Sequence, residues 1–230
     1  MNYERNLKYY QSNDKHFYVG IIILGVGALL FAIGNLLGFR MFPSQTPVAM
    51  TIMGIGAIVA YVPAGKRSNE HDIDAAVLVL TNKYDEEVAE SVNITLSRRI
   101  KPVLFGEYIY DGDDILVRRG LSDRKYRTSK YVASALLFTK DGVYISQKTV
   151  SLIEDSAVET DMEFVFEYLD EVYTVHEERI FGEDKVKVSF FVIKEEGEEK
   201  ARIPVKYNAI VDKVCDDVNN AIKEAKGLRR

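Results

Sequence analysis

Two long apolar runs dominate the first third of the chain. Residues 17–39 include no Asp, Glu, Lys or Arg, and a second uncharged run covers residues 41–65 after Arg40. A helix of about 20 apolar residues is long enough to cross the roughly 30 Å hydrocarbon core of a bilayer. The pattern therefore predicts two transmembrane helices, at 17–39 and 46–64 within an anchor of residues 17–65, after an N-terminal segment of residues 1–16.

A cleavable signal sequence is the alternative for the first run, because Lys15 and His16 precede it and small residues occur at positions 32 and 34. The apolar core of a signal sequence is only about 7–15 residues long, however, and here a second apolar run follows directly. We therefore expect an anchor. Neither predicted span contains an acidic or basic residue, which argues against an ion or proton pathway.

The basic residues next to the two runs predict the orientation of the anchor. Arg5, Lys8 and Lys15 precede the first run, and Lys66 and Arg67 follow the second. Only Arg40 lies between the two runs. Because cytoplasmic flanks are enriched in Lys and Arg, both termini are expected in the cytoplasm. The single cysteine, Cys215, rules out an intramolecular disulfide and agrees with that compartment.

Small residues recur at a spacing of four in both predicted spans. Gly34 and Gly38 lie in the first span, and Gly56 and Ala60 lie in the second. This spacing allows helix backbones to approach closely. It predicts packing between the two helices of the hairpin, with homo-oligomerisation through the same face as the alternative.

The pattern changes after the anchor. Apolar residues recur every three to four positions from Ile73 to Val92, which predicts a helical connector within residues 66–100, with an interruption near Asn82. Beyond Pro102, short β-branched and aromatic runs alternate with turn residues. They predict antiparallel strands at 105–110, 115–118, 131–139, 143–146, 149–153, 162–168, 172–181, 185–193 and 200–204. A final amphipathic helix is predicted at about 207–226.

The net charge and the lack of metal-binding or catalytic motifs limit the classes of function expected of the C-terminal part, residues 101–230. From Ser68 onward the chain has 24 Lys and Arg against 33 Asp and Glu, a formal net charge of −9, so a nucleic-acid partner is not expected. The three histidines lie far apart in sequence and fit no zinc spacing, and Cys215 is expected to be a small buried side chain. Because no catalytic motif is present, we expect no enzyme, metal or cofactor.

The order of strands followed by one terminal helix resembles the pleckstrin-homology (PH) superfold. Residues 136–145, LLFTKDGVYI, are similar to the apolar strand, turn and tyrosine-bearing strand of bacterial PH-like domains, many of which follow one or two membrane spans. The resemblance implies an α+β fold, in which a PH-like antiparallel β sandwich or barrel is capped by the C-terminal helix. It also implies a binding or scaffolding function without catalysis, directed at a protein, a peptide or lipid headgroups. Because the similar domains are bacterial, the resemblance implies that the anchor lies in the inner (cytoplasmic) membrane of a bacterium.

One basic cluster stands out in this acidic part of the chain. Its members are Arg118, Arg119, Arg124, Lys125, Arg127 and Lys130. On a membrane-facing hairpin such residues attract anionic headgroups, so the cluster is the candidate lipid- or anion-binding site. A solvated hairpin that balances the acidic surface is the alternative. For the whole chain, the alternative to a binding module is a small accessory subunit that joins a larger membrane complex through its hairpin.

Overall fold

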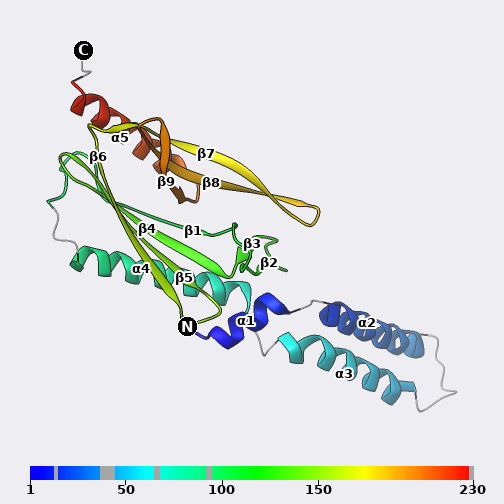
Figure 1. Cartoon of the computed structure of the whole chain (residues 1–230). Helices are drawn as coiled ribbons and strands as arrows, with labels where there is room; N and C mark the ends of the chain where they lie inside the picture. Colours follow the sequence, from blue (N-terminus) through cyan, green and yellow to red (C-terminus); the bar gives the residue numbers. More distant parts are fainter. Residues whose placement is uncertain (13–14, 37–44, 65–67, 92–94, 228–230) are drawn as a thin grey trace. The chain divides into compact units, whose positions relative to one another are not determined.

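The computed structural model describes residues 1–12, 15–36, 45–64, 68–91 and 95–227 (Figure 1). The chain divides into two compact units, Asn2–Asn69 and Glu70–Arg230. The first unit is helical, and the second combines antiparallel sheets with helices. The α+β class predicted from the sequence, with antiparallel strands and a C-terminal helix, is therefore confirmed.

The first unit contains α1 (Tyr3–Gln11), α2 (Lys15–Leu36) and α3 (Gln45–Ala64). Helix α1 was not predicted. The side chain of Asn2 caps its N-terminus by accepting a hydrogen bond from the Arg5 amide over 3.1 Å. Ser68 then ties the chain beyond α3 to α1, because its hydroxyl donates to the Asn6 side chain over 2.6 Å.

Helices α2 and α3 pack closely through small residues. A Cβ atom added to Gly20 would lie 2.5 Å from the Ala60 backbone nitrogen, and one added to Gly56 would lie 2.5 Å from that of Leu24. The predicted packing residues Gly56 and Ala60 thus lie in this contact, together with Gly20 of α2. Gly34 is half-buried, whereas Gly38 lies outside the described residues.

Among the described helices, only one of the two predicted spans is long and apolar enough to cross a membrane. The stretch Lys15–Gly34, with a mean hydropathy of 2.5, is long and apolar enough to cross a membrane. In α3 the apolar stretch Thr46–Val62 is shorter and does not reach the length required of a span. The prediction of two full spans is therefore corrected to one candidate span and a shorter apolar helix that packs against it.

The second unit begins with α4 (Glu70–Ser91), a continuous helix without the interruption expected near Asn82. A four-stranded antiparallel sheet follows, in the order β1 (Val103–Tyr108), β4 (Lys130–Phe138), β5 (Gly142–Ser151), β6 (Ala157–Val165). The ribbon β2 (Val117–Arg119) and β3 (Tyr126–Thr128) is inserted between β1 and β4. The three-stranded sheet β7 (Leu169–Phe181), β8 (Asp184–Glu195), β9 (Glu198–Pro204) and helix α5 (Ala209–Ala225) complete the unit.

Several strand predictions need correction. Strand β5 is one continuous strand where two short ones, at 143–146 and 149–153, were predicted. The three-residue strand β3 was not predicted at all, and β6 begins and ends earlier than the predicted 162–168. Helix α5 agrees with its prediction within two residues at each end.

The main core lies between the two sheets and α5. Buried side chains come from the four-stranded sheet (Leu136, Phe138, Ile145), the three-stranded sheet (Phe191, Ile193, Ile203) and α5 (Val211, Val214, Val218). Cys215 is buried at the same place, as predicted, with its sulfur 3.6 Å from the Thr174 hydroxyl, and burial raises the pKa of its thiol.

Helix α4 covers the opposite face of the four-stranded sheet (Figure 1). The Tyr84 hydroxyl donates to Ser146 Oγ over 2.7 Å, and Glu87 forms an ion pair with Lys148 over 2.7 Å. Burial raises the pKa of Tyr84 to about 12. The connector predicted from periodicity is therefore a layer of the second unit.

Candidate functional site

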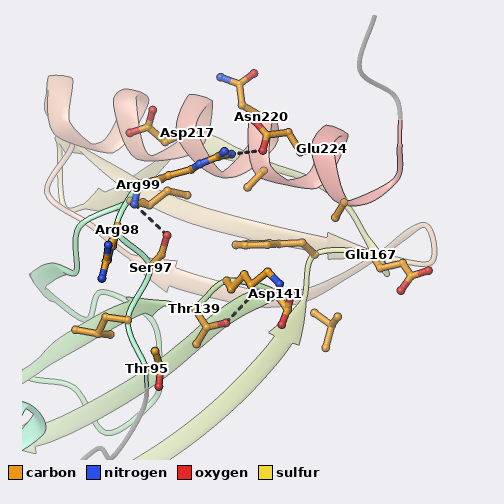
Figure 2. A pocket seen from close by; sticks show the side chains of 17 residues that line it. Thr95, Ser97, Arg98, Arg99, Thr139, Asp141, Glu167, Asp217, Asn220 and Glu224 are labelled. Carbon is orange, nitrogen blue, oxygen red and sulfur yellow. Dashed lines mark hydrogen bonds and ion pairs between the residues drawn. The ribbon is translucent and has the colours of Figure 1, made fainter.

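An open cleft of about 910 Å³ lies between α5, the segment 95–100 and the loops at one end of the four-stranded sheet (Figure 2). Apolar side chains of Ile100, Phe166 and Ala221 line part of it. The lining also contains charged groups of both signs, which are the basic Arg98, Arg99 and Lys140 and the acidic Asp141, Glu167, Asp217 and Glu224. All of these residues belong to the second unit.

Hydrogen bonds from backbone amides fix the loops that form the cleft. The Thr139 hydroxyl accepts a hydrogen bond from the Gly142 amide over 2.9 Å and shapes the turn between β4 and β5. The Phe166 amide donates to the Asp141 carbonyl over 2.9 Å, so the chain leaving β6 is attached to this turn. The Ser97 amide donates to the Phe138 carbonyl at the end of β4. The cleft is thus built on the end of a sheet and not on isolated loops.

Helix α5 supplies the opposite wall of the cleft. Asn208 caps its N-terminus by accepting from the Ile210 amide over 2.8 Å, and its apolar stripe faces the core. Asp217, Asn220 and Glu224 of α5 are among the residues that line the cleft, and Figure 2 shows Glu224 directed toward Arg99. An ion pair between Glu224 and Arg99 crosses from α5 to the segment 95–100.

The mixed lining suits a ligand with both polar and apolar groups. Neither His nor Cys lines the cleft. Among the described residues, no group of three or more His, Cys, Asp or Glu side chains is placed to hold a metal ion. The cleft offers hydrogen-bonding groups, charges of both signs and an apolar floor, which are the features of a binding site for a peptide or a small amphipathic molecule.

One pair in the second unit resembles a nucleophile and its base. His176 Nδ1 lies 2.8 Å from Ser189 Oγ on the adjacent strand, and the His176 ring packs edge-on against Tyr207. Ser189 is only 6% exposed. The pair was not predicted, because strand pairing alone brings these two residues together.

The structure places the members of the predicted basic cluster in different environments. Arg127 is 2% exposed, and its guanidinium donates to Asp74 over 2.7 and 2.6 Å and to Asp123 over 3.1 and 2.7 Å. Hydrogen bonding to Arg127 lowers the pKa of Asp123 to about 2. For Asp74, burial acts to raise the pKa, but hydrogen bonds and the charge of Arg127 outweigh it and lower the pKa.

The other five members of the cluster also differ in environment. Arg118 is buried, Arg119 pairs with Asp184 over 2.7 Å, and Lys130 pairs with Asp114 over 2.5 Å. Arg124 and Lys125 are exposed at the tip of the β2–β3 ribbon. The expectation of six cations on one lipid-facing surface is therefore corrected, because Arg127 and Arg118 are buried and two others are held by carboxylates.

The cleft residues were not singled out from the sequence. The polar face of the predicted final helix contains Asp217, Asn220 and Glu224 at helical spacing, and this is a signal that such a face could contact something. By contrast, no local sequence pattern indicates that the segment 95–100 lies beside α5. Comparison with protein-family models, with curated proteins and with solved structures finds no match.

Proposed function

We propose that this chain is a membrane-anchored, non-catalytic module that binds a segment of a protein partner in the cleft beside α5, at the cytoplasmic membrane surface. The observation that supports this most strongly is the cleft itself. It is open to solvent, combines an apolar floor with charges of both signs, and is framed by hydrogen-bonded loops and a capped helix. Such a preformed site binds without a large ordering cost.

A PH-like fold is part of the proposal. The element order supports it: a four-stranded antiparallel meander is followed by a three-stranded one and then by a terminal helix, with the β2–β3 ribbon as an insertion after the first strand. The buried position of Ser189 beside His176 supports binding over hydrolysis.

The last part of the proposed function is attachment to a membrane through the first unit. Helices α2 and α3 expose many large apolar side chains, among them Ile22 (64%), Leu29 (62%) and Ile58 (61%). Exposed apolar surface of this extent is unfavourable in water and favourable in lipid. We assign α2 as the membrane span, with the shorter apolar helix α3 packed against it, and place the second unit on the cytoplasmic side. A signal sequence at α2 is the competing assignment.

Site-specific photocrosslinking in native membranes tests the proposal. A photoreactive residue placed at Asn220, an exposed position of the cleft lining, is expected to give a discrete protein adduct. The same residue at Lys187, on strand β8 and outside the cleft lining, serves as the control and is expected to give none. Equal labelling from both positions, or no adduct from Asn220, would overturn the proposal. Protein adducts obtained only from α2 and α3 positions would favour the accessory-subunit alternative.

A further inference from the structure

Strand β6 is an open edge of the four-stranded sheet. It pairs with β5 on one side, and within the described part of the chain no strand pairs with its other side. Its side chains are exposed at every position from Ala157 to Asp161. Strand β7, the first strand of the other sheet, differs because Asn219 of α5 bonds both the amide and the carbonyl of Val172, over 2.9 and 2.8 Å. Among the described residues, the only turn bond to β6 runs from the Tyr168 amide to the Val165 carbonyl, so an added strand has backbone partners along Ala157–Phe164.

The side chains of β6 alternate between two chemistries. Glu159, Asp161 and Glu163 lie on the face that bears Lys148 and Tyr144, as the pairing with β5 shows. Val158, Thr160 and Met162 lie on the other face, where Met162 packs against the core. Residues two apart on a strand are about 7 Å from each other, so the three carboxylates form an evenly spaced acidic row.

This acidic row is only partly neutralised within the chain. Lys148 pairs with Glu159 over 2.8 Å, but the same ammonium also pairs with Glu87 over 2.7 Å. From Ser151 to Tyr173 the sequence contains eight acidic residues and no Lys or Arg. The edge thus has an excess of negative charge along its whole length.

The charge of the edge decides which strand fits it. Pairing of β6 with the same strand of a second copy would place carboxylates beside carboxylates, and like charges on neighbouring strands destabilise a pair. A strand with Lys or Arg at every second position instead places one cation beside each of Glu159, Asp161 and Glu163. β-branched residues at the intervening positions would lie beside Val158 and Thr160.

We propose that β6 binds an extended segment of the partner by strand addition, and that this segment alternates Lys or Arg with β-branched residues. The inference rests on the proposed function and specifies the chemistry of the partner. Strand β6 ends at Val165, which lines the cleft together with Phe166 and Glu167. A segment added along β6 therefore continues into the cleft beside α5.

A synthetic peptide tests this inference on the full chain in detergent micelles. The probe is a fluorescent peptide as long as β6 that alternates Lys with Val or Thr. The first comparison peptide has the same composition with all lysines at one end, and the second replaces each Lys by Glu. Two further probes carry N-methyl groups on the backbone nitrogens, one probe at the odd-numbered residues and the other at the even-numbered residues. An added strand donates hydrogen bonds to β6 from only one of these two sets of nitrogens, so only one of the two probes should be blocked. Fluorescence anisotropy measures binding at low and high salt.

The alternating peptide is expected to bind at least about tenfold more tightly than the block peptide, a ratio that corresponds to about 1.4 kcal/mol. One of the two N-methylated probes should lose binding, and the Glu peptide should not bind. In the chain, Asp161→Lys with Glu163→Lys should weaken binding about tenfold or more. The matched reversal of two exposed acids on other turns, Glu183→Lys with Glu196→Lys, should change it less than about twofold.

Equal binding of the alternating and block peptides would overturn the inference, because charge alone would then explain the affinity. Equal effects of the two reversal pairs, or full binding by both N-methylated probes, would also overturn it. The Asn220 crosslink in native membranes separates the two claims. If that adduct persists in the Asp161→Lys, Glu163→Lys chain and the alternating peptide does not bind the parent chain, the strand-addition inference fails while the proposed function stands. If the peptide binds but Asn220 gives no adduct, the proposed function fails while strand addition at β6 stands.

Discussion

Removing both carboxylates that contact Arg127 is expected to lower the free energy of unfolding of the second unit by about 3–5 kcal/mol, the usual cost of breaking a buried ion pair by removing the partner of the buried charge. The guanidinium is 2% exposed and donates two hydrogen bonds to Asp74, two to Asp123 and one to the Lys125 carbonyl. The Asp74 and Asp123 side chains are 48% and 29% exposed, so water solvates them if Arg127 is lost.

The single variants provide the internal comparison. Asp74→Ala or Asp123→Ala leaves one carboxylate beside Arg127, and each is expected to cost about 1–2 kcal/mol, since a hydrogen bond to a charged group contributes about 1.5–3 kcal/mol before solvent exposure of the acid is considered. Arg127→Met removes the buried charge and leaves two acids that water can reach. It should therefore cost less than the double acid variant, although both remove the same contacts.

Urea unfolding of the full chain in detergent micelles measures these differences. The chain has no Trp, so far-ultraviolet circular dichroism follows the sheets. With a denaturant dependence of about 2 kcal/mol per molar urea, a loss of about 4 kcal/mol lowers the midpoint by about 2 M. If the double acid variant unfolds at the same urea concentration as Arg127→Met, or as the parent chain, the guanidinium is solvated and the account of the cluster is wrong.

Three further outcomes are expected. Asn219→Ala removes both hydrogen bonds to the Val172 backbone and should cost about 1–3 kcal/mol; amide exchange at Val172 checks it, and unchanged protection would refute the contact. Gly56→Leu should separate α2 from α3 and expose both to protease in micelles, whereas Gly54→Leu, where nothing lies within 4 Å, should not; equal digestion would contradict this. Because the pKa of Asp123 falls from 3.8 to about 2 on folding, its stabilisation is complete above about pH 4 and is lost as the pH falls to about 2; acid unfolding of Asp123→Ala should lack this component.

Elements with strong local patterns were predictable, and α5 is the clearest case. Its apolar stripe repeats at helical spacing, and Asn208 marks its start with a cap. Strand β5 was divided because Gln147 and Lys148 interrupt its apolar pattern. In the structure Lys148 faces α4 and pairs with Glu87, so a polar residue is accommodated inside a sheet by a partner 61 positions earlier.

The candidate sites were less predictable because they depend on distant pairing. The basic cluster was visible in sequence, but the pairing of Arg127 with Asp74 joins residues 53 positions apart and turns a candidate surface cation into a buried one. The cleft combines the segment 95–100 with α5, and no local pattern links them. The acidic alternation of β6 was present in the sequence, while its position at an open sheet edge follows only from the strand order.

The partition of the full chain after alkaline carbonate extraction of cell membranes tests most directly whether the first unit anchors the second to a bilayer. Carbonate removes peripheral proteins and leaves proteins with membrane-spanning helices in the pellet. We expect the chain, detected through a tag after Arg230, in the pellet at its full length. Recovery in the supernatant, or as a shorter form cleaved after α2, would contradict the account.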